Sequence, residues 1–413
     1  MSRTGRTGRM HCTRAPRRAG LCFRGAAGAA LTLGCAIAVR TAASQAPQAP
    51  VRTLGKPLAE FPEGFSVIGA VRELRNGRVV VLDSKDRVLL LADFAAGTSA
   101  KVSRQGGGPL EYTMPGALLA LPGDSTLVVD LMQRRFLALG PDATPIRTIP
   151  FAGNTGDPMA MLRMPILTAA DRRGYAYGTG LPTTMGRGGV AIADTVSLVR
   201  QRLSDGQLDT LAIVRFPSGD VSMSQGAGGA ISIRMTPRVF EPRDAWAAFP
   251  DGRVAVVRGA DYHVEWIGAD KAVRRTPPIP FDRVRIGADA KKTVMDSMRT
   301  MMEKSFGAGL AAVEGRGNVP RPSIEIAEPE RWPEYYSPVA SAFAATDGHL
   351  WVARMGIPGD KIARYDVLDA NGKLLYAVRF PERTTLLGFG NGVLYAVRVD
   401  DDDLQYLGRY AIP

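Results

Sequence analysis

One hairpin pattern recurs along this chain, and it constrains the fold more than any other feature of the sequence. Each copy has a short apolar strand, a polar turn with glycine and a second apolar strand, as in residues 73–83 and 248–257. The six turn glycines are Gly77, Gly123, Gly174, Gly252, Gly348 and Gly392. Asn-Gly and Asp-Gly between apolar runs indicate tight hairpins, because the turn needs a positive φ angle. Six such units predict a six-bladed β-propeller with one four-stranded blade per unit.

One long interval between these glycines contains a different pattern. We expect an insertion over residues 283–335, with an amphipathic helix over 288–306 because apolar and charged residues alternate there at helical spacing. Its methionines suit either packing on the propeller rim or a binding surface. Residues 307–322 are rich in glycine and proline and predict a loop. The expected fold class is therefore all-β, a six-bladed β-propeller with one inserted amphipathic helix.

The two ends of the chain are expected to meet. After Gly392 there is room for only two or three strands, so the last blade needs another strand. Residues 51–58 near the N-terminus could supply it. Sharing a blade in this way ties the first unit to the last and covers open strand edges.

The first 46 residues have a composition of their own. They contain eight arginines, no acidic residue and an apolar run over 25–39 that ends before small residues. This order predicts a signal peptide over 1–46 and a propeller over 47–413, exported to the bacterial periplasm or beyond. A lipid anchor through Cys35 is the alternative. The apolar run is short for a membrane span, so we expect no transmembrane span in the mature chain.

Charge and cysteine content exclude several kinds of function. The formal net charge of +12 falls to +4 when the eight N-terminal arginines are set aside, so we expect no nucleic-acid partner. All three cysteines lie in the first 46 residues, which excludes disulfides and thiol chemistry from the rest of the chain. Beyond residue 46 the histidines are His263 and His349. His263 and Glu265 share one strand face, but a packed histidine is the simpler interpretation than a metal ligand.

Other segments resemble phosphate-binding or metal-binding motifs, but each has a simpler structural interpretation. Residues 186–189 and 226–229 are glycine-rich but lack the Lys-Ser/Thr of a phosphate loop, so we expect turns. Residues 400–403 are four consecutive aspartates, which alternate between faces in a strand and are expected to form a solvated hairpin tip. No Gly-x-Ser-x-Gly motif is present.

Two segments carry a resemblance to a known family. Residues 130–136, Asp-Leu-Met-Gln-Arg-Arg-Phe, resemble the signature of NHL repeats, and Asp83 to Arg87 is a shorter version. Residues 104–112, Arg-Gln-Gly-Gly-Gly-Pro-Leu-Glu-Tyr, resemble a glycine-rich linker of secreted bacterial six-bladed propellers related to NHL repeats, with Leu110 where glycine is usual. The resemblance covers residues 50–413 and implies the fold. Because this family is largely uncharacterised, it implies no activity. Asp83 and Asp130 are expected to accept hydrogen bonds in turns rather than to catalyse.

Propellers bind ligands on the face where the channel opens, using the loops that lead into the innermost strands. Arginines, tyrosines and one glutamate in these loops could hold an anionic or sugar-like ligand. We expect candidates at Arg104, Glu111, Tyr112, Arg163, Arg243, Tyr336 and Arg383. The sequence thus predicts a monomeric, exported, non-catalytic binding or scaffolding propeller for an unknown small molecule or protein, without a cofactor. The alternative is a metal-dependent hydrolase or lyase of the lactonase or NHL-lyase type, for which calcium is the candidate metal.

Overall fold

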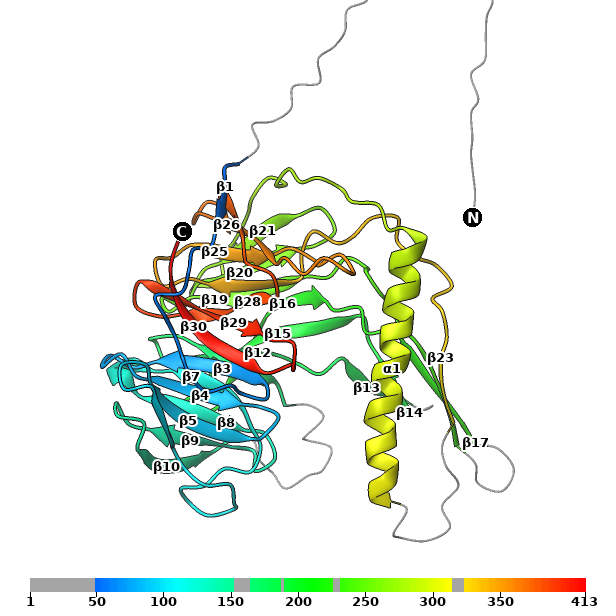
Figure 1. Ribbon diagram of the computed structural model, residues 1–413. Coiled ribbons are helices and arrows are strands. Elements are labelled where there is room, and N and C mark those ends of the chain that lie inside the picture. The colour runs from blue at the N-terminus through cyan, green and yellow to red at the C-terminus, as the bar shows by residue number, and fades with distance from the viewer. Residues whose placement is uncertain (1–48, 152–163, 187–188, 226–230, 314–322) are drawn as a thin grey trace, which may run out of the picture. The chain divides into compact units, whose positions relative to one another are not determined.

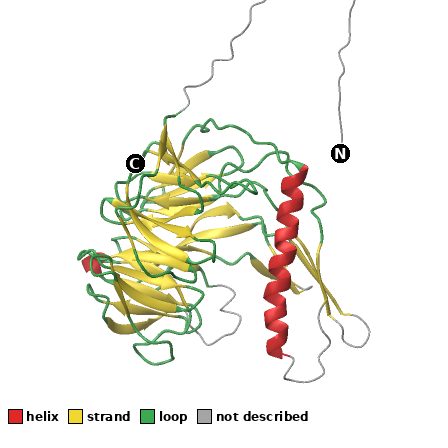
Figure 2. Ribbon diagram, in the orientation of Figure 1, coloured by secondary structure: helices red, strands yellow, loops and turns green. Residues whose placement is uncertain are grey.

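Successive hairpins build a series of antiparallel sheets, and the result is a nearly all-β fold of propeller type (Figure 1, Figure 2). The computed structural model describes residues 49–151, 164–186, 189–225, 231–313 and 323–413. No helix in these ranges is both long enough and apolar enough to cross a membrane.

The first three sheets each contain four strands in a meander. The first consists of β3 (Ile68–Glu73), β4 (Val79–Asp83), β5 (Val88–Asp93) and β6 (Thr98–Lys101). The second consists of β7 (Pro115–Ala120), β8 (Thr126–Asp130), β9 (Arg135–Leu139) and β10 (Pro145–Pro150), with a 3-10 turn η1 (Pro122–Asp124) between β7 and β8. The third consists of β11 (Ile166–Ala170), β12 (Tyr175–Thr179), β15 (Thr195–Arg202) and β16 (Leu208–Arg215).

The same pattern continues in the second half of the chain. One sheet consists of β19 (Ala245–Ala248), β20 (Val254–Arg258), β21 (His263–Ile267) and β22 (Val273–Arg275). The next consists of β24 (Ser341–Ala344), β25 (Leu350–Ala353), β26 (Arg364–Leu368) and β27 (Leu374–Arg379), with β1 (Val51–Thr53) added parallel to β27. The last consists of β28 (Thr384–Phe389), β29 (Val393–Val399), β30 (Gln405–Ala411) and β2 (Ala59–Glu60).

The N-terminal segment completes the last sheet, as the sequence led us to expect, but with different residues. The outer strand is β2, which pairs antiparallel to β30, whereas residues 51–53 pair with β27 of the preceding sheet. The segment is long enough to serve two neighbouring sheets, and Leu58 N–H already donates to the Arg409 carbonyl at 2.7 Å. Glu60 also pairs with Arg398 at 2.8 Å, which fixes this junction.

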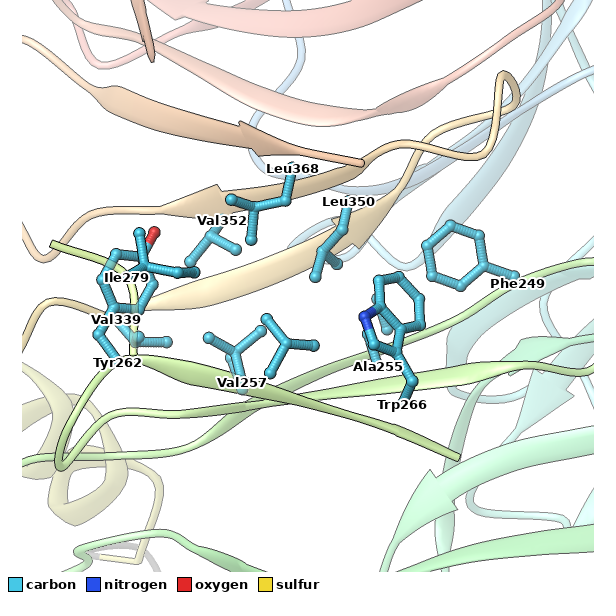
Figure 3. Close-up of a cluster of buried hydrophobic side chains, with 13 residues drawn as sticks. Phe249, Ala255, Val257, Tyr262, Trp266, Ile279, Val339, Leu350, Val352 and Leu368 are labelled. Atoms are coloured by element: carbon cyan, nitrogen blue, oxygen red, sulfur yellow. The ribbon is translucent and has the colours of Figure 1, made fainter. Parts of the chain in front are cut away.

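The innermost strands lie next to one another around a common centre. β3 contacts β7 and β28, β11 contacts β7 and β19, and β19 contacts β24. Apolar side chains fill the space between neighbouring sheets, as in the cluster between the β19–β22 and β24–β27 sheets (Figure 3). There Trp266, Phe249 and Tyr262 from one sheet meet Leu350 and Val352 from the other. Burial of these large side chains holds neighbouring sheets together.

All six glycines that the sequence places in hairpin turns have positive φ angles, from +73° at Gly392 to +89° at Gly252. A side chain at such a position strains the backbone. The repeated turn predicted from sequence is therefore confirmed at each site.

The insertion contains the predicted helix, but the helix is longer than expected. α1 (Ala288–Val313) continues beyond residue 306 into the segment predicted as a loop. Within the added part of the helix, the good helix formers Ala308, Leu310, Ala311 and Ala312 outweigh Gly307 and Gly309. The beginning of α1 packs Ala290 and Val294 near Phe240 and Tyr336, and of its methionines Met295 is buried whereas Met301 is exposed.

Two small sheets complete the described structure. β13 (Thr183–Gly186) and β14 (Gly189–Ile192) pair antiparallel, and residues 187–188 of the turn expected at 186–189 lie outside the described residues. The other small sheet contains β17 (Asp220–Gln225), β18 (Ile231–Thr236) and β23 (Ser323–Ile326). The sequence did not predict β23, which lies in the 283–335 insertion and pairs parallel to β18. Residues 226–229 lie outside the described residues.

Candidate functional site

A cavity of about 450 Å³ lies where the innermost strands converge. Residues of β11, β19, β24 and β28 line it, together with Thr179 of β12, Val196 of β15, Val214 of β16 and the residues just before β19 and β24. The channel cavity, as we call it, is lined by Thr168, Ala169, Thr179, Val196, Val214, Phe216, Arg243, Asp244, Ala245, Trp246, Ala247, Ala248, Ala340, Ser341, Ala342, Phe343, Ala344, Gly388 and Phe389. Most of these side chains are small and apolar, so the converging strands leave space between them.

The sequence Arg-Asp-Ala-Trp-Ala-Ala over 243–248 supplies the polar edge of this cavity and one of its walls. In β19, Ala245 and Ala247 are buried, while Trp246 and Ala248 are half-buried. The alternation of a strand explains this difference, because successive side chains point to opposite faces. Trp246 is therefore the large aromatic side chain that β19 contributes to the cavity.

Asp244 and Arg243 are adjacent but have different environments. Asp244 accepts hydrogen bonds from Arg215 N–H at 3.0 Å, Gly259 N–H at 3.1 Å and the Arg258 guanidinium at 2.7 Å. It is therefore occupied in holding loops together. The Arg243 guanidinium lies 4.8 Å from the centre of the Phe216 ring, a cation–π contact. Within the described ranges, no acidic side chain forms an ion pair with Arg243.

The backbone of Arg243 is fixed by a close approach to Gly259. A Cβ atom on Gly259 would lie 2.0 Å from the Arg243 carbonyl oxygen. Only glycine fits there without movement of the backbone. The hydrogen bond from Gly259 to Asp244 adds to this contact, so the Arg243–Asp244 pair has a defined position at the cavity.

A charge network centred on the buried Glu265 is linked to this edge of the cavity. Glu265 pairs with Arg258 at 2.5 Å and with Arg275 at 2.5 Å. Burial opposes ionisation of Glu265, but the hydrogen bonds from both arginines hold the pKa of its carboxyl below its usual value. Arg258 also bonds Asp244, so this network links β21 to the loop that carries Arg243.

His263 lies next to this network, on the strand face that the sequence predicted it to share with Glu265. Its Nδ1 is 2.6 Å from Asp261, and its Nε2 is 3.6 Å from Glu265. His349 pairs with Asp347 at 2.8 Å in its turn. In the part of the chain that the structure describes, no three His, Cys, Asp or Glu side chains gather closely enough to hold a metal ion.

A second cavity, of about 370 Å³, opens between the β24–β27 and β28–β30 sheets. The side pocket, as we call it, shares Ser341 and Phe343 of β24 with the channel cavity. Its remaining lining is Ala353, Arg354, Met355, Gly356, Ile357, Asp360, Lys361, Ile362, Ala363, Arg364, Tyr365, Thr385 and Leu386.

The glycine-rich loop 104–112, which contributed three candidates, is a self-contained structure. Glu111 accepts from Gly108 N–H at 2.8 Å and pairs with Arg104. These two hydrogen bonds hold the pKa of Glu111 below its usual value. Side chains on Gly106 and Gly108 would collide with the Glu111 carboxylate, which explains why the motif combines glycines with a glutamate.

The third candidate in this loop, Tyr112, lies in the core. Its side chain is buried, and its hydroxyl accepts from Leu89 N–H at 3.0 Å. Burial raises the pKa of this phenol. Tyr112 thus ties the loop to the first sheet, and none of the three loop candidates lines the channel cavity.

The other candidates are distributed over the molecule. Tyr336 is buried against Phe240, with ring centres 4.8 Å apart. Arg383 pairs with Asp401 at 3.0 Å, while its N–H donates to the Lys361 carbonyl at 2.9 Å. Arg163 lies outside the described residues. Arg243 alone among the described candidates lines the channel cavity.

Asp83, Asp130 and the aspartate run at 400–403 have the structural roles that the sequence predicted. Asp83 accepts from the N–H groups of Ser66 at 2.7 Å and Lys85 at 3.1 Å. Asp130 accepts from Thr113 N–H at 3.0 Å and Met114 N–H at 3.0 Å. The Asp400–Asp403 run is a hairpin tip in which Asp400 accepts backbone N–H groups and the next three residues are exposed.

Sequence reasoning missed most of the cavity lining. The alanines, Trp246, Ser341 and Phe343 come from strands far apart in the chain, and their residue types are ordinary for strands. The one sequence signal for this cavity was the Arg243-Asp244 pair, which comes directly before the strand segment Ala-Trp-Ala-Ala over 245–248.

The sequence matches no protein-family model and no curated protein. Solved structures with a similar fold include a member of the DUF4221 family from Bacteroides vulgatus, 11% identical with a TM-score of 0.46, covering 87% of this chain and 98% of that one. A calcium-binding protein, regucalcin, from Agrobacterium tumefaciens is 13% identical with a TM-score of 0.40, covering 88% and 97%. A gluconolactonase from Xanthomonas campestris is 11% identical with a TM-score of 0.41, covering 88% and 99%. These values assign the chain to no family and to no activity.

Proposed function

We propose that this protein is an exported, six-bladed binding propeller that holds a small organic anion with an apolar body in its channel cavity, without transforming it. The observation that carries the proposal is Arg243, which lines the cavity and whose side chain forms no ion pair within the described residues. A guanidinium at an apolar cavity favours a carboxylate, sulfonate or phosphate group.

The rest of the lining supports the same class of ligand. The volume of about 450 Å³ falls within the range of about 300 to 1,000 Å³ typical of small-molecule sites. Alanines, Trp246 and Phe389 would cover an apolar body, and Thr168, Thr179 and Ser341 offer hydroxyl groups. In a largely apolar lining, a small number of polar groups is enough to fix the orientation of a ligand.

The blade count belongs to this proposal. The four-stranded sheets follow one another along the chain, and β2 closes the last of them onto the N-terminal segment. Export is proposed from the basic and apolar order of residues 1–46, which lie outside the described residues. We propose a monomer in the periplasm or outside the cell.

Three probes of similar length test the class of ligand, namely decanoate, decanol and decylamine. Isothermal titration of the purified protein should show decanoate binding at least about tenfold more tightly than decylamine, because one charge-assisted hydrogen bond is worth about 1.5 to 3 kcal/mol. Arg243→Gln should remove this preference. Arg147→Gln, on an exposed position of β10, is the matched control and should retain it. Equal affinity for decanoate and decylamine would overturn the proposal.

A further inference from the structure

The channel cavity and the side pocket meet at one strand. Ser341 and Phe343 of β24 line both cavities, and they are two residues apart, so their side chains lie on the same face of the strand. Phe343 packs with the cluster between the last two sheets, whereas Ala342 and Ala344 pack with the cluster on the other side of β24. The side pocket and the channel cavity are therefore neighbours that lie on either side of these two side chains.

The cations of the side pocket differ in their partners. Arg354 pairs with Asp366 at 3.1 Å, and Arg364 pairs with Asp360 at 2.9 Å. Lys361 is exposed, and no ion pair joins it to an acidic side chain among the residues described. Asp360 is the one carboxylate in the lining, and Arg364 already neutralises it. An anionic group in this pocket would thus find Lys361 available.

The backbone that carries Lys361 is held in place by the last sheet. The Lys361 carbonyl accepts from Arg383 N–H at 2.9 Å, and Ile362 bridges to Thr384. Phe380 N–H donates to the Ala363 carbonyl at 2.9 Å. Lys361 therefore extends from a segment that is anchored at several points, as a binding group requires.

Part of the side pocket lining is apolar. Phe343, Ile362, Leu386 and Tyr365 belong to this part. The Tyr365 hydroxyl accepts from Leu386 N–H at 2.8 Å, and burial raises the pKa of Tyr365 to about 12, so the phenol stays neutral at physiological pH. These side chains offer an apolar surface to a methylene chain that passes Phe343.

We propose that the side pocket binds the second anionic end of an elongated ligand whose first anionic end lies at Arg243. The ligand class is a long-chain dianion, such as an α,ω-dicarboxylate, with its methylene chain passing Ser341 and Phe343. This inference rests on the proposed function, because it assigns a ligand class to the same channel. Lys361 is the specificity-determining residue, since it distinguishes two anionic ends from one.

Isothermal titration with paired probes tests the inference. Suberate, sebacate, dodecanedioate and hexadecanedioate are each compared with the monocarboxylate of equal length. At least one dicarboxylate should bind about tenfold more tightly than its monocarboxylate, as expected for one added charge-assisted contact. Lys361→Met should abolish this difference and leave monocarboxylate affinity unchanged. Lys361→Arg should keep the difference, and so should Lys373→Met, at an exposed turn lysine.

The outcomes separate this inference from the proposed function. If dicarboxylates bind no more tightly than monocarboxylates, or if Lys361→Met retains the preference, the second subsite is overturned while the anion site at Arg243 stands. If neither class binds to the unaltered protein, the proposed function fails and this inference fails with it.

Discussion

Gly259→Ala is expected to destabilise the fold and to weaken anion binding, because Gly259 lies directly against the backbone of Arg243. The added Cβ would lie 2.0 Å from the Arg243 carbonyl oxygen and 2.9 Å from its carbonyl carbon. Real Cβ atoms essentially never approach another heavy atom this closely. The clash involves backbone on both sides, so a rotamer change cannot relieve it.

The magnitude follows from two opposing effects. Where alanine fits the backbone, replacing glycine stabilises a protein by about 0.4 to 1 kcal/mol through the unfolded state. Gly259 does not have a positive φ angle, so this gain is available in principle. Overpacking against fixed backbone costs about 1 to 3 kcal/mol, and displacement of Asp244 weakens its hydrogen bond with Gly259 N–H. We therefore expect a net loss of about 2 kcal/mol.

Urea unfolding followed by circular dichroism measures the stability, and titration with decanoate measures the site. Gly259→Ala should lower the midpoint of unfolding and weaken decanoate binding about tenfold, because the guanidinium moves with its backbone. Gly55→Ala is the control, since no atom lies within 4 Å of its Cβ position. A Gly259→Ala protein with unchanged stability and affinity would refute the reasoning.

Three further predictions concern charge and metal. Glu265→Gln should cost about 2 kcal/mol at pH 7, because it weakens the charge-assisted hydrogen bonds from Arg258 and Arg275, although Arg258 keeps Asp244 as a partner. Since the folded pKa of Glu265 is lowered, its contribution is complete above the unfolded value of about 4.3 and is lost as pH falls through the folded value. Urea midpoints measured from pH 7 to pH 3 should fall less in Glu265→Gln than in the unaltered protein, because the other carboxylates with lowered pKa values, such as Glu111, still contribute in both. Asp130→Asn should cost about 2 kcal/mol by weakening its hydrogen bonds to two loop N–H groups, whereas the exposed Asp86→Asn should change the urea midpoint little. Elemental analysis of protein purified without chelator should find well below one equivalent of calcium or zinc, and EDTA should leave decanoate affinity unchanged. Stoichiometric metal would favour the alternative of a metal-dependent hydrolase or lyase.

The sequence predicted local structure well because each hairpin carries its own signal. Asp-Gly or Asn-Gly between apolar runs requires a positive φ angle wherever it occurs, and Gly77, Gly252 and Gly392 all have one. Even the need for an N-terminal strand was correctly anticipated, because the last unit had too few residues for four strands.

The candidate site was mostly beyond prediction, because the strands that line it are far apart in the sequence. Arg243 was expected from its position before an inner strand, and the same reasoning selected Tyr112 and Tyr336, which are buried in the core. A tyrosine in a loop can turn inward or outward, and the choice depends on neighbouring sheets. The role of Lys361 depends on the hydrogen bond from Arg383 to its carbonyl, which no local pattern reveals.

The most direct test of the central claim is quenching of tryptophan fluorescence by a brominated fatty acid. Trp246 lines the channel cavity, whereas Trp332 packs near Phe240 and Tyr336 and does not line it. If the anion occupies the channel, bromodecanoate should quench fluorescence in a saturable manner, Trp246→Phe should lose that quenching and Trp332→Phe should keep it. Saturable quenching that survives Trp246→Phe, or that disappears with Trp332→Phe, would contradict binding in the channel cavity.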